Sequence, residues 1–316
     1  LPHISVAGAI MTATHGSGER HQNLAATVSS SELGRADGER VVLRRGEPGF
    51  AGSVVGLGAL GVITALTLDL VPAFEIRQYV YDDLTRDSLG DNLDAVLGAG
   101  YSVSLFTNWQ STTINHVWLK RLSSDEMPPG PFFGAEAADG KRGPIPGMDP
   151  TNATDQGGVP GPWHARLPHF KLEFTPSAGE EIQSEFFVAA SDASAAFAVI
   201  KGLAHVISPL LFVCEIRAVA ADDLWLSGAY GRDTVAFHFT WHPEETRVRE
   251  VLAQVEAGLA PFGARPHWGK VFTAAAAQIA PLYPRFDDFL ALRSRLDPDG
   301  RFRSGYTDRI LDGTTR

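Results

Sequence analysis

The last third of the chain carries the pattern that most constrains its fold. Apolar runs of strand length and helix length follow one another in order, beginning with "EEIQSEFFVA" and ending with "GKVFTA". The predicted strands are 180–189, 210–219, 234–241 and 269–274, and the predicted helices are 192–206 and 244–262. Strand, helix, strand, strand, helix, strand is the order of a ferredoxin-like α+β sheet with both helices on one face. The other face must therefore meet something else.

The residues of that open face are polar. Side chains alternate between the two faces of a strand, so the parity of each residue predicts its side. Three strands each turn two polar residues toward the open face: Gln183 and Glu185, Glu215 and Arg217, and His238 and Thr240. A solvent-washed face is the alternative, but such faces usually collect Lys, Thr, Ser and Glu. Fixed donors and acceptors beside aromatic residues suit a polyhydroxylated ligand, so we predict a binding floor here.

The earlier part of the chain consists of shorter strands and one long irregular stretch. The predicted strands are 40–43, 62–70, 76–84, 101–109 and 115–122, and a helix is predicted over 89–100. Pro72 ends the second of these strands. From Met127 to Pro176 the chain is dense in Pro and Gly. An irregular stretch of this length is usually a functional loop or a linker, and a solvated surface excursion is the alternative.

Composition limits the classes of partner. The 316 residues carry a net charge of −10 and no basic cluster with interleaved aromatic residues, so no nucleic-acid partner is predicted. No apolar run reaches the roughly 18 to 20 residues of a membrane span. A single cysteine excludes an intramolecular disulfide and fits a reducing compartment. We expect a cytoplasmic monomer that acts on a small molecule, without a metal site.

Two glycine-rich motifs match familiar patterns in the wrong context. "GLGALG" (56–61) fits G-x-G-x-x-G, but a strand follows it where a dinucleotide-binding motif requires a helix, so a Rossmann site is excluded. "THGSG" (14–18) resembles the oxyanion-hole motif of some esterases, but no G-x-S-x-G accompanies it, which disfavours a serine hydrolase. The small residues of 5–18 instead let main-chain N–H groups approach a flat or phosphorylated ligand closely. A tight structural turn is the alternative.

The segment "RPHWGKVF" (265–272) places His267 and Lys270 on either side of Trp268 and Gly269. Most lysines are surface charges, and that is one interpretation of Lys270. A lysine beside an apolar, Trp-containing segment is equally suited to act as a desolvated cation that faces developing negative charge.

Taken together, several motifs resemble the alditol (xylitol) oxidases. These belong to the vanillyl-alcohol-oxidase group of FAD-linked oxidases, which includes the sugar-lactone oxidases. The motifs are "LPHISVAG", "THGSG", "GALGVIT", "LFVCEIRAV", "HFTW", "RPHWGK" and "LDPDGRF", and the resemblance covers essentially all 316 residues. It implies an α+β flavoprotein with two domains. Residues 1–72 would be the remainder of an FAD-binding domain, 73–270 a cap domain with a ferredoxin-like antiparallel sheet, and 271–316 a segment that returns to the FAD domain.

The resemblance also implies roles for individual residues. The flavin would be bound by Ser5, Thr14, His15, Gly16, Ser17, Gly18 and His267, with Val62 near the adenine end. The substrate would be bound by Ser5, Gln183, Glu215, Arg217, His238, Thr240 and Lys270. The catalytic residues among these would be Arg217, Lys270, His238 and Glu215. In the "DPDGRF" region Ser304 stands where an Asn is common in the family.

In this family the chain upstream of "LPHIS" supplies the loop that binds the pyrophosphate and, in alditol oxidases, the histidine covalently attached to FAD. None of the ten histidines here matches that motif. We therefore expect an upstream segment, with any covalent attachment residue in it.

The implied activity is FAD-dependent oxidation of a primary alditol hydroxyl to the aldose, with hydride transfer to flavin N5 and reoxidation by O2 to give H2O2. Arg217 and Lys270 would polarise the hydroxyl, Glu215 would orient Arg217, and His238 would be a proton acceptor. The alternatives are an aldonolactone oxidase of the D-arabinono-1,4-lactone oxidase type, a flavin dehydrogenase of the same fold, and a polyol-binding fragment without flavin.

Overall fold

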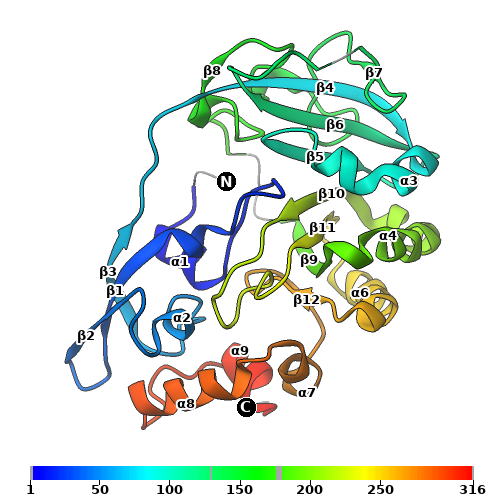
Figure 1. The fold of residues 1–316 in the computed structure, drawn as a ribbon. Helices are drawn as coiled ribbons and strands as arrows, with labels where there is room; N and C mark the ends of the chain where they lie inside the picture. The colour runs from blue at the N-terminus through cyan, green and yellow to red at the C-terminus, as the bar shows by residue number, and fades with distance from the viewer. Residues whose placement is uncertain (1–2, 129, 176–179, 315–316) are drawn as a thin grey trace.

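The computed structural model describes residues 3–128, 130–175 and 180–314, which form two antiparallel sheets with helices packed around them (Figure 1). The smaller sheet has the strand order β2-β1-β3. Its strands are β1 (Val28–Gly34), β2 (Arg40–Arg44) and β3 (Val62–Leu68). The sequence did not predict β1, because its "VSSSELG" contains few β-branched residues and relies on pairing with both neighbours.

The larger sheet has the order β12-β9-β11-β10-β5-β6-β4-β7, and β8 also pairs with β4. Its strands are β4 (Glu75–Thr85), β5 (Ser102–Thr107), β6 (Thr113–Leu122), β7 (Glu136–Ala137), β8 (Gly161–Pro162), β9 (Ile182–Ala189), β10 (Leu211–Val219), β11 (Thr234–Trp241) and β12 (Arg265–Pro266). The order β12-β9-β11-β10 is the predicted ferredoxin-like arrangement. Pairing of β10 with β5 extends this unit into one continuous sheet.

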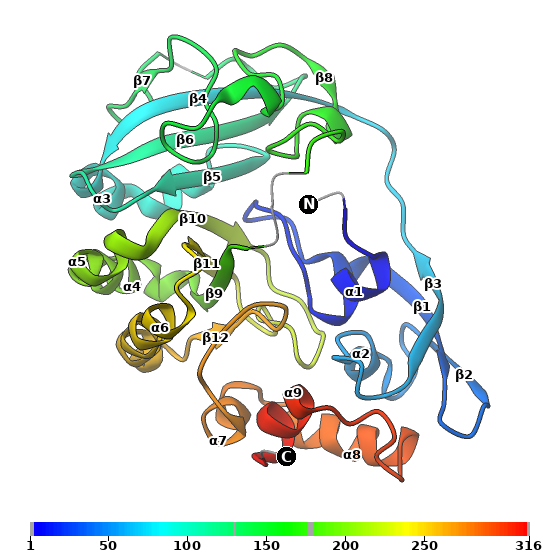
Figure 2. The ribbon, with the colours of Figure 1, turned by 180° about the vertical axis from the view of Figure 1, so that it is seen from behind.

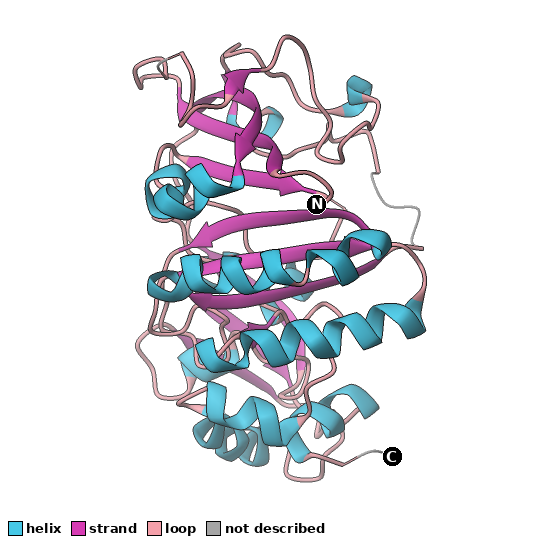
Figure 3. Cartoon of the chain, turned by 90° about the vertical axis from the view of Figure 1, so that its right-hand side faces the viewer, coloured by secondary structure: helices cyan, strands magenta, loops and turns pink. Residues whose placement is uncertain are grey.

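Helices cover one face of the larger sheet, as Figure 3 shows. They are α3 (Arg86–Leu97), α4 (Ala193–Gly202), α5 (Ala204–Ile207) and α6 (Glu245–Leu259). The buried residues of α6 are Val248, Val251, Leu252, Val255 and Leu259, a spacing of three and four that forms one apolar stripe. Cys214, Ile216, Phe237 and Phe239 of the strands are fully buried in the same core. The polar residues of the opposite parity therefore lie on the open face, as predicted.

The first and last parts of the chain pack against each other and share a core with this sheet. They contain α1 (Val6–Met11), α2 (Phe50–Ser53), α7 (Ala276–Ile279), α8 (Phe286–Leu296) and α9 (Gly305–Thr307), and α8 contacts α2 (Figure 1). Single turns of 3₁₀-helix lie at 24–27, 150–152, 163–165, 190–192, 208–210, 260–262 and 280–282, and a π-helical turn at 308–312. The sheets are joined by residues 69–74, which contain the predicted boundary at 72. The division into domains stays a prediction.

Two predicted elements are wrong in detail. Residues 269–274 do not form a strand; the fourth strand of the ferredoxin-like unit is the two-residue β12, after which the chain turns. The predicted helix over 192–206 is divided at Leu203 into α4 and α5.

No single helix among the described residues is long and apolar enough to cross a membrane, although the bent pair 190–202 and 204–210 reaches that length and composition when taken together.

The Pro- and Gly-rich stretch after Met127 covers part of the open face, over β4 and β6 (Figure 2). β7 and β8 of this stretch pair with β4. Its Ala153 packs against an apolar cluster of Val80, Phe106, Trp118 and Val213. The stretch is therefore packed against the sheet rather than extended into solvent, and the polar residues of β9, β10 and β11 lie beyond this apolar cluster.

Candidate active site on the open face of the sheet

Strand register aligns three titratable residues in a row across the open face. His238 on β11 pairs with Glu185 on β9 and with Glu215 on β10. Directly opposed residues of antiparallel strands point to the same face, with their Cβ atoms about 5 Å apart. The sheet thus brings together residues separated by up to 53 positions, because 238 and 185 occupy one register pair.

Glu185 is the centre of the cluster. Its side chain is 0% exposed, and its carboxylate lies 2.5 Å from Lys270 Nζ, 2.6 Å from Arg217 Nη2 and 3.2 Å from His15 Nε2. Burial raises the pKa of Glu185, but Lys270 and Arg217 together hold this pKa well below its usual range. A buried carboxylate between two cations is an ion-pair network whose members fix one another.

Lys270 reaches this network because the chain stays alongside β9 after β12 ends. The backbone N–H of His267 donates to the carbonyl of Glu185 at 2.9 Å, and that of Val271 donates to the carbonyl of Gln183 at 2.8 Å. Between these bonds the chain turns, with the N–H of Lys270 donating to the carbonyl of His267 at 3.1 Å. This turn places the lysine beside the carboxylate. Burial lowers the pKa of Lys270, while Glu185 opposes that shift.

His238 is held as a neutral imidazole. Its Nδ1 lies 2.6 Å from Lys270 Nζ, and its Nε2 lies 3.1 Å from Thr240 Oγ1. An ammonium only donates, so Nδ1 accepts from Lys270 and Nε2 carries the hydrogen that it donates to Thr240. Burial, followed by Lys270, lowers the pKa of His238 to about 4. Because Nδ1 is engaged, direct proton acceptance from a substrate, as the sequence led us to expect, is blocked in this arrangement.

Arg217 and Glu215 keep hydrogen-bonding capacity for a ligand. Arg217 contacts Glu185 at 2.6 Å and also forms the predicted pair with Glu215, in which its Nε lies 3.6 Å from Glu215 Oε2, beyond hydrogen-bond range. Among the described residues, neither Arg217 Nε nor Glu215 Oε1 has a hydrogen-bond partner, although both atoms are buried. Burial raises the pKa of Glu215, but Arg217, followed by His169, brings it down to about 2, so the group is a carboxylate. Buried polar atoms without partners are rare in proteins, and these two leave a donor and an acceptor free for a ligand or water.

The exposed fraction of each side chain distinguishes the groups that a ligand can touch from the group that is buried beneath them. The side chains of Glu215, His238, Arg217 and Lys270 remain 9%, 10%, 12% and 15% exposed, whereas Glu185 is wholly enclosed. We name the surface formed by Lys270, His238, Thr240, Arg217 and Glu215 the polar trough. Gln183, opposite Thr240 in register, lies at its edge.

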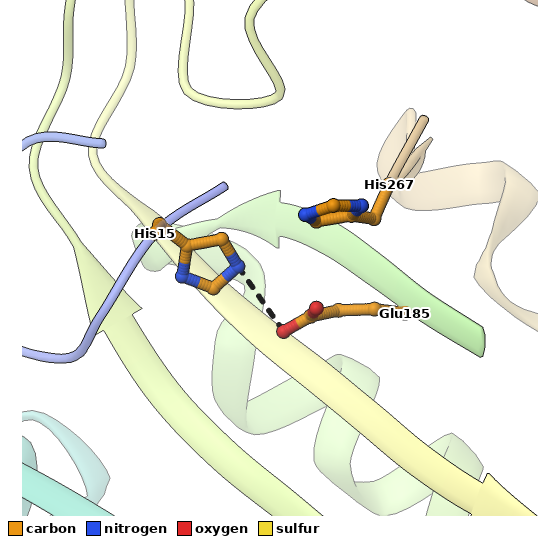
Figure 4. A group of neighbouring side chains, drawn as sticks. All are labelled: His15, Glu185 and His267. Atoms are coloured by element: carbon orange, nitrogen blue, oxygen red, sulfur yellow. Dashed lines mark ion pairs between the residues drawn. The ribbon is translucent and has the colours of Figure 1, made fainter. Parts of the chain in front are cut away.

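The "THGSG" run passes beside the polar trough. The N–H of Gly18 donates to the carbonyl of Ala218 at 2.8 Å, which ties the run to the end of β10. Ser17 Oγ lies 2.5 Å from Ser102 Oγ on β5. His15 of the run extends to Glu185, as Figure 4 shows. Thr14 forms a hydrogen bond with Thr12, in which the two hydroxyl oxygens lie 3.2 Å apart. The run and the sheet are therefore parts of one site.

Two predicted cofactor residues, Ser5 and Val62, are exposed. Ser5 caps α1, since its Oγ accepts from the N–H of Gly8 at 2.9 Å, and it is exposed. Val62 begins β3 in the smaller sheet and is 58% exposed. Their roles at a cofactor stay predictions.

Glu185 is the functional residue that sequence reasoning left out of the site. Its parity placed it on the open face, but nothing in the sequence showed that two cations would converge on it. His169 was also missed, because it lies in the irregular stretch; its Nε2 lies 3.6 Å from Glu215 Oε1. No periodicity could indicate that contact.

Ligand-type atoms of His15, Glu185 and His267 lie within 4.8 Å of one another (Figure 4). A metal ion is disfavoured here by charge, because Lys270 and Arg217 already occupy the carboxylate oxygens. Burial, followed by Lys270, keeps the pKa of His267 well below its usual range. Its Nδ1 accepts from the N–H of Gly269 at 3.1 Å, so this imidazole supports the turn that carries Lys270.

Comparison with known proteins connects this geometry to a family. The D-arabinono-1,4-lactone oxidase family model matches residues 183–310. An alditol oxidase from Streptomyces is 49% identical over 313 residues, which are 99% of this chain and 74% of that protein. An L-gulono-1,4-lactone dehydrogenase from Mycobacterium tuberculosis is 32% identical over 330 residues, covering 97% of this chain and 74% of that protein.

Solved structures show the same fold at low sequence identity. A cholesterol oxidase from Brevibacterium sterolicum matches with a TM-score of 0.71 at 14% identity, covering 96% of this chain and 74% of that one. A vanillyl-alcohol-oxidase-type flavoprotein from Myceliophthora thermophila matches with a TM-score of 0.59 at 13% identity, covering 94% and 60%. With the fold of these flavoproteins and its close relationship to the Streptomyces enzyme, the chain belongs to the alditol oxidase family.

Proposed function

We propose that the protein oxidises a primary hydroxyl of an alditol of the xylitol or sorbitol class to the aldose, using FAD and O2 and producing H2O2. The relative named alditol oxidase, at 49% identity, supports this substrate class. The observation that carries the proposal is the convergence of Lys270 and Arg217 on Glu185, beside buried donors and acceptors that lack partners. Two fixed cations favour the alkoxide form of an alcohol, and the free atoms suit neighbouring hydroxyls.

The residues beside the polar trough fit a flat flavin. A Cβ added to Gly16 would meet no atom within 4 Å, and among the described residues no group accepts a hydrogen bond from the backbone N–H of Gly16 or Ser17. Ile4 and Val6 are 44% and 56% exposed at the start of α1, and these offer apolar surface. Open backbone donors and exposed apolar side chains within one segment, 4–17, match a ring system with polar edges and apolar faces. We assign FAD binding to residues 14–18 and His267.

When bound, FAD accepts the two electrons that the alcohol loses. The polar trough prepares the alcohol for that loss. An ammonium has three donors, and Lys270 uses two of them on Glu185 and His238, which leaves one for the reacting hydroxyl. Arg217 Nε supplies a second donor toward developing negative charge. Glu215 accepts from a hydroxyl further along the substrate.

The contact between Lys270 and His238 provides a route for the hydroxyl proton. As Lys270 takes the proton from the hydroxyl, it can pass one of its own to His238 Nδ1, 2.6 Å away. Thr240 fixes the imidazole so that Nδ1 faces the lysine. Glu185 offsets the added positive charge, because its carboxylate contacts Lys270 and lies 3.7 Å from His238 Nδ1.

A visible absorption spectrum tests the proposal. Protein purified with added FAD should show a flavin spectrum that bleaches with xylitol under anaerobic conditions and returns with air. A flavin spectrum that xylitol does not change would contradict alditol oxidation.

A second candidate function is oxidation of a sugar lactone. It is favoured by the match of residues 183–310 to the D-arabinono-1,4-lactone oxidase family model and by the lactone dehydrogenase relative at 32% identity. Assays with an aldonolactone, and with an artificial electron acceptor in place of O2, separate this function from the first. Faster bleaching by the lactone than by xylitol would favour it.

A further inference from the structure

The irregular stretch after Met127 contains a segment, residues 167–169, that buried groups hold beside the polar trough. Three consecutive carbonyls of this segment are bound by buried groups. Lys120 Nζ donates to Leu167 O at 2.5 Å, Thr154 Oγ1 donates to Pro168 O at 2.7 Å, and the N–H of Thr154 donates to His169 O at 3.0 Å. Lys120 is 1% exposed, and Thr154 is 3% exposed. Anchored in this way, His169 has a defined position on the sheet.

The ring of His169 lies at the end of the polar trough that is remote from Lys270. Glu215 on β10 is opposite Phe106 on β5 in register. The imidazole packs edge-on against Phe106 and Trp118, with ring centroids 5.1 and 5.2 Å away. These two aromatic rings belong to the apolar cluster where the polar surface ends. His169 therefore stands at the boundary between the polar trough and the covered part of the sheet.

His169 also faces the carboxylate oxygen of Glu215 that lacks a hydrogen-bond partner. Its Nε2 lies 3.6 Å from Glu215 Oε1, the buried oxygen that lacks a hydrogen-bond partner. The His169 side chain is 22% exposed, so a molecule in the trough can touch it. The corresponding values for trough residues are lower: 15% for Lys270, 12% for Arg217, 10% for His238 and 9% for Glu215. Burial, followed by Lys120, lowers the pKa of His169 to about 3, so the ring is neutral and offers one donor and one acceptor.

From β11 to β5 the sheet spans two interstrand spacings, about 10 Å in all. An extended alditol of five or six carbons can bridge such a distance, with its reacting end at Lys270. We propose that His169 closes the far end of the polar trough and sets the length of alditol accepted, by hydrogen bonding the terminal hydroxyl together with Glu215. This inference rests on the proposed function, because it assumes an alditol in the trough.

The test compares His169→Ala and His169→Gln with the wild type, each as FAD-loaded protein, on erythritol, xylitol and sorbitol. For His169→Ala the KM for xylitol should rise about tenfold, the loss expected of one hydrogen bond, while kcat changes much less. Removing the end wall should also raise the ratio of kcat/KM for sorbitol over xylitol by about fivefold or more. His169→Gln keeps a donor and an acceptor, and should recover most of the xylitol KM.

Phe170→Ala is the matched control, because Phe170 is the next residue of the same segment and packs on Phe174 instead of the trough. It should leave both the KM and the length ratio as in the wild type. A thermal unfolding midpoint for each variant shows whether the protein is folded. If His169→Ala does not fold, His169→Phe replaces it, because it keeps a ring and removes both hydrogen-bonding nitrogens. A xylitol KM raised about tenfold in His169→Phe supports the inference, and a KM equal to that of the wild type overturns it.

Calorimetric titration of the three alditols into chemically reduced protein under anaerobic conditions gives a readout that does not depend on turnover. The Kd values should show the same change in length preference as the KM values. Unchanged KM, Kd and length ratios in a folded His169→Ala protein overturn the inference while leaving the proposed function intact. Wild-type protein that neither oxidises nor binds any of the three alditols overturns the proposed function and the inference with it.

Discussion

Lys270 Nζ lies 2.5 Å from Glu185 Oε2, although the two residues are 85 positions apart in the chain. The lysine follows the last strand of the ferredoxin-like unit and the glutamate lies in its first strand, which are neighbours in the sheet. The fold therefore creates the ion pair directly, by the 4-1-3-2 order of the strands.

Removing the ammonium group of Lys270 should abolish most of the turnover and leave the folded structure largely unchanged. We expect Lys270→Ala to slow anaerobic flavin reduction by xylitol by about 10² to 10³-fold, the loss typical of one donor that stabilises developing negative charge. Stopped-flow absorbance measures the rate directly. Lys201→Ala is the control, because Lys201 on α4 is 44% exposed and pairs with Asp87 at the surface. Near-normal reduction by Lys270→Ala would exclude its assigned role.

Neutralising the buried carboxylate should affect both activity and stability. In Glu185→Gln, Lys270 and Arg217 lose their common counter-charge and remain buried, which costs about 3 kcal/mol or more of the free energy of unfolding. Urea unfolding measures this loss. Glu180→Gln, at an exposed position before β9, should leave stability unchanged. Equal stability of the two variants would show that Glu185 does not hold the cluster together.

The buried His238 should make the protein sensitive to mild acid. Its pKa is about 4 in the folded protein against 6.5 for the free side chain, so the unfolded chain binds more protons between these values. Its contribution, about 3 kcal/mol, is present above pH 6.5 and is lost as the pH falls toward 4. We expect His238→Gln to weaken the pH dependence of urea unfolding in this window. An identical slope in the variant and the wild type would contradict the burial of a neutral imidazole.

Substitution by alanine should have different effects at two glycines of the "THGSG" run. Gly18 has φ +140°, and a Cβ there would lie 2.4 Å from His21 Cδ2 and 2.6 Å from the Tyr101 carbonyl oxygen. We expect Gly18→Ala to lower the free energy of unfolding by about 2 kcal/mol. Gly16 has open space around it, so Gly16→Ala should keep the stability and weaken FAD binding, measured by flavin fluorescence. Tight FAD binding by Gly16→Ala would place the flavin elsewhere.

Much of the fold could be predicted from local pattern. The strands and helices of 180–262 alternate with clear periods, and parity alone placed Glu215 and Arg217 on the face opposite the helices. The prediction failed where local pattern is weak: at β1, which is rich in serine, and at 269–274, where the chain turns after the two residues of β12 that pair with β9. The strand propensity of a residue describes its own segment only, whereas pairing depends on the neighbouring strand that packs alongside that segment.

By itself the sequence determined the kinds of groups on the open face, because the period of two in a strand leaves no freedom in which side a residue faces. It also identified Lys270 as a cation beside an apolar segment. Only the tertiary structure decided that Lys270 and Arg217 share Glu185, that His238 accepts from the lysine, and that His169 stands at the end of the polar trough. These contacts depend on register and on the path of long loops, which arise from packing between distant segments.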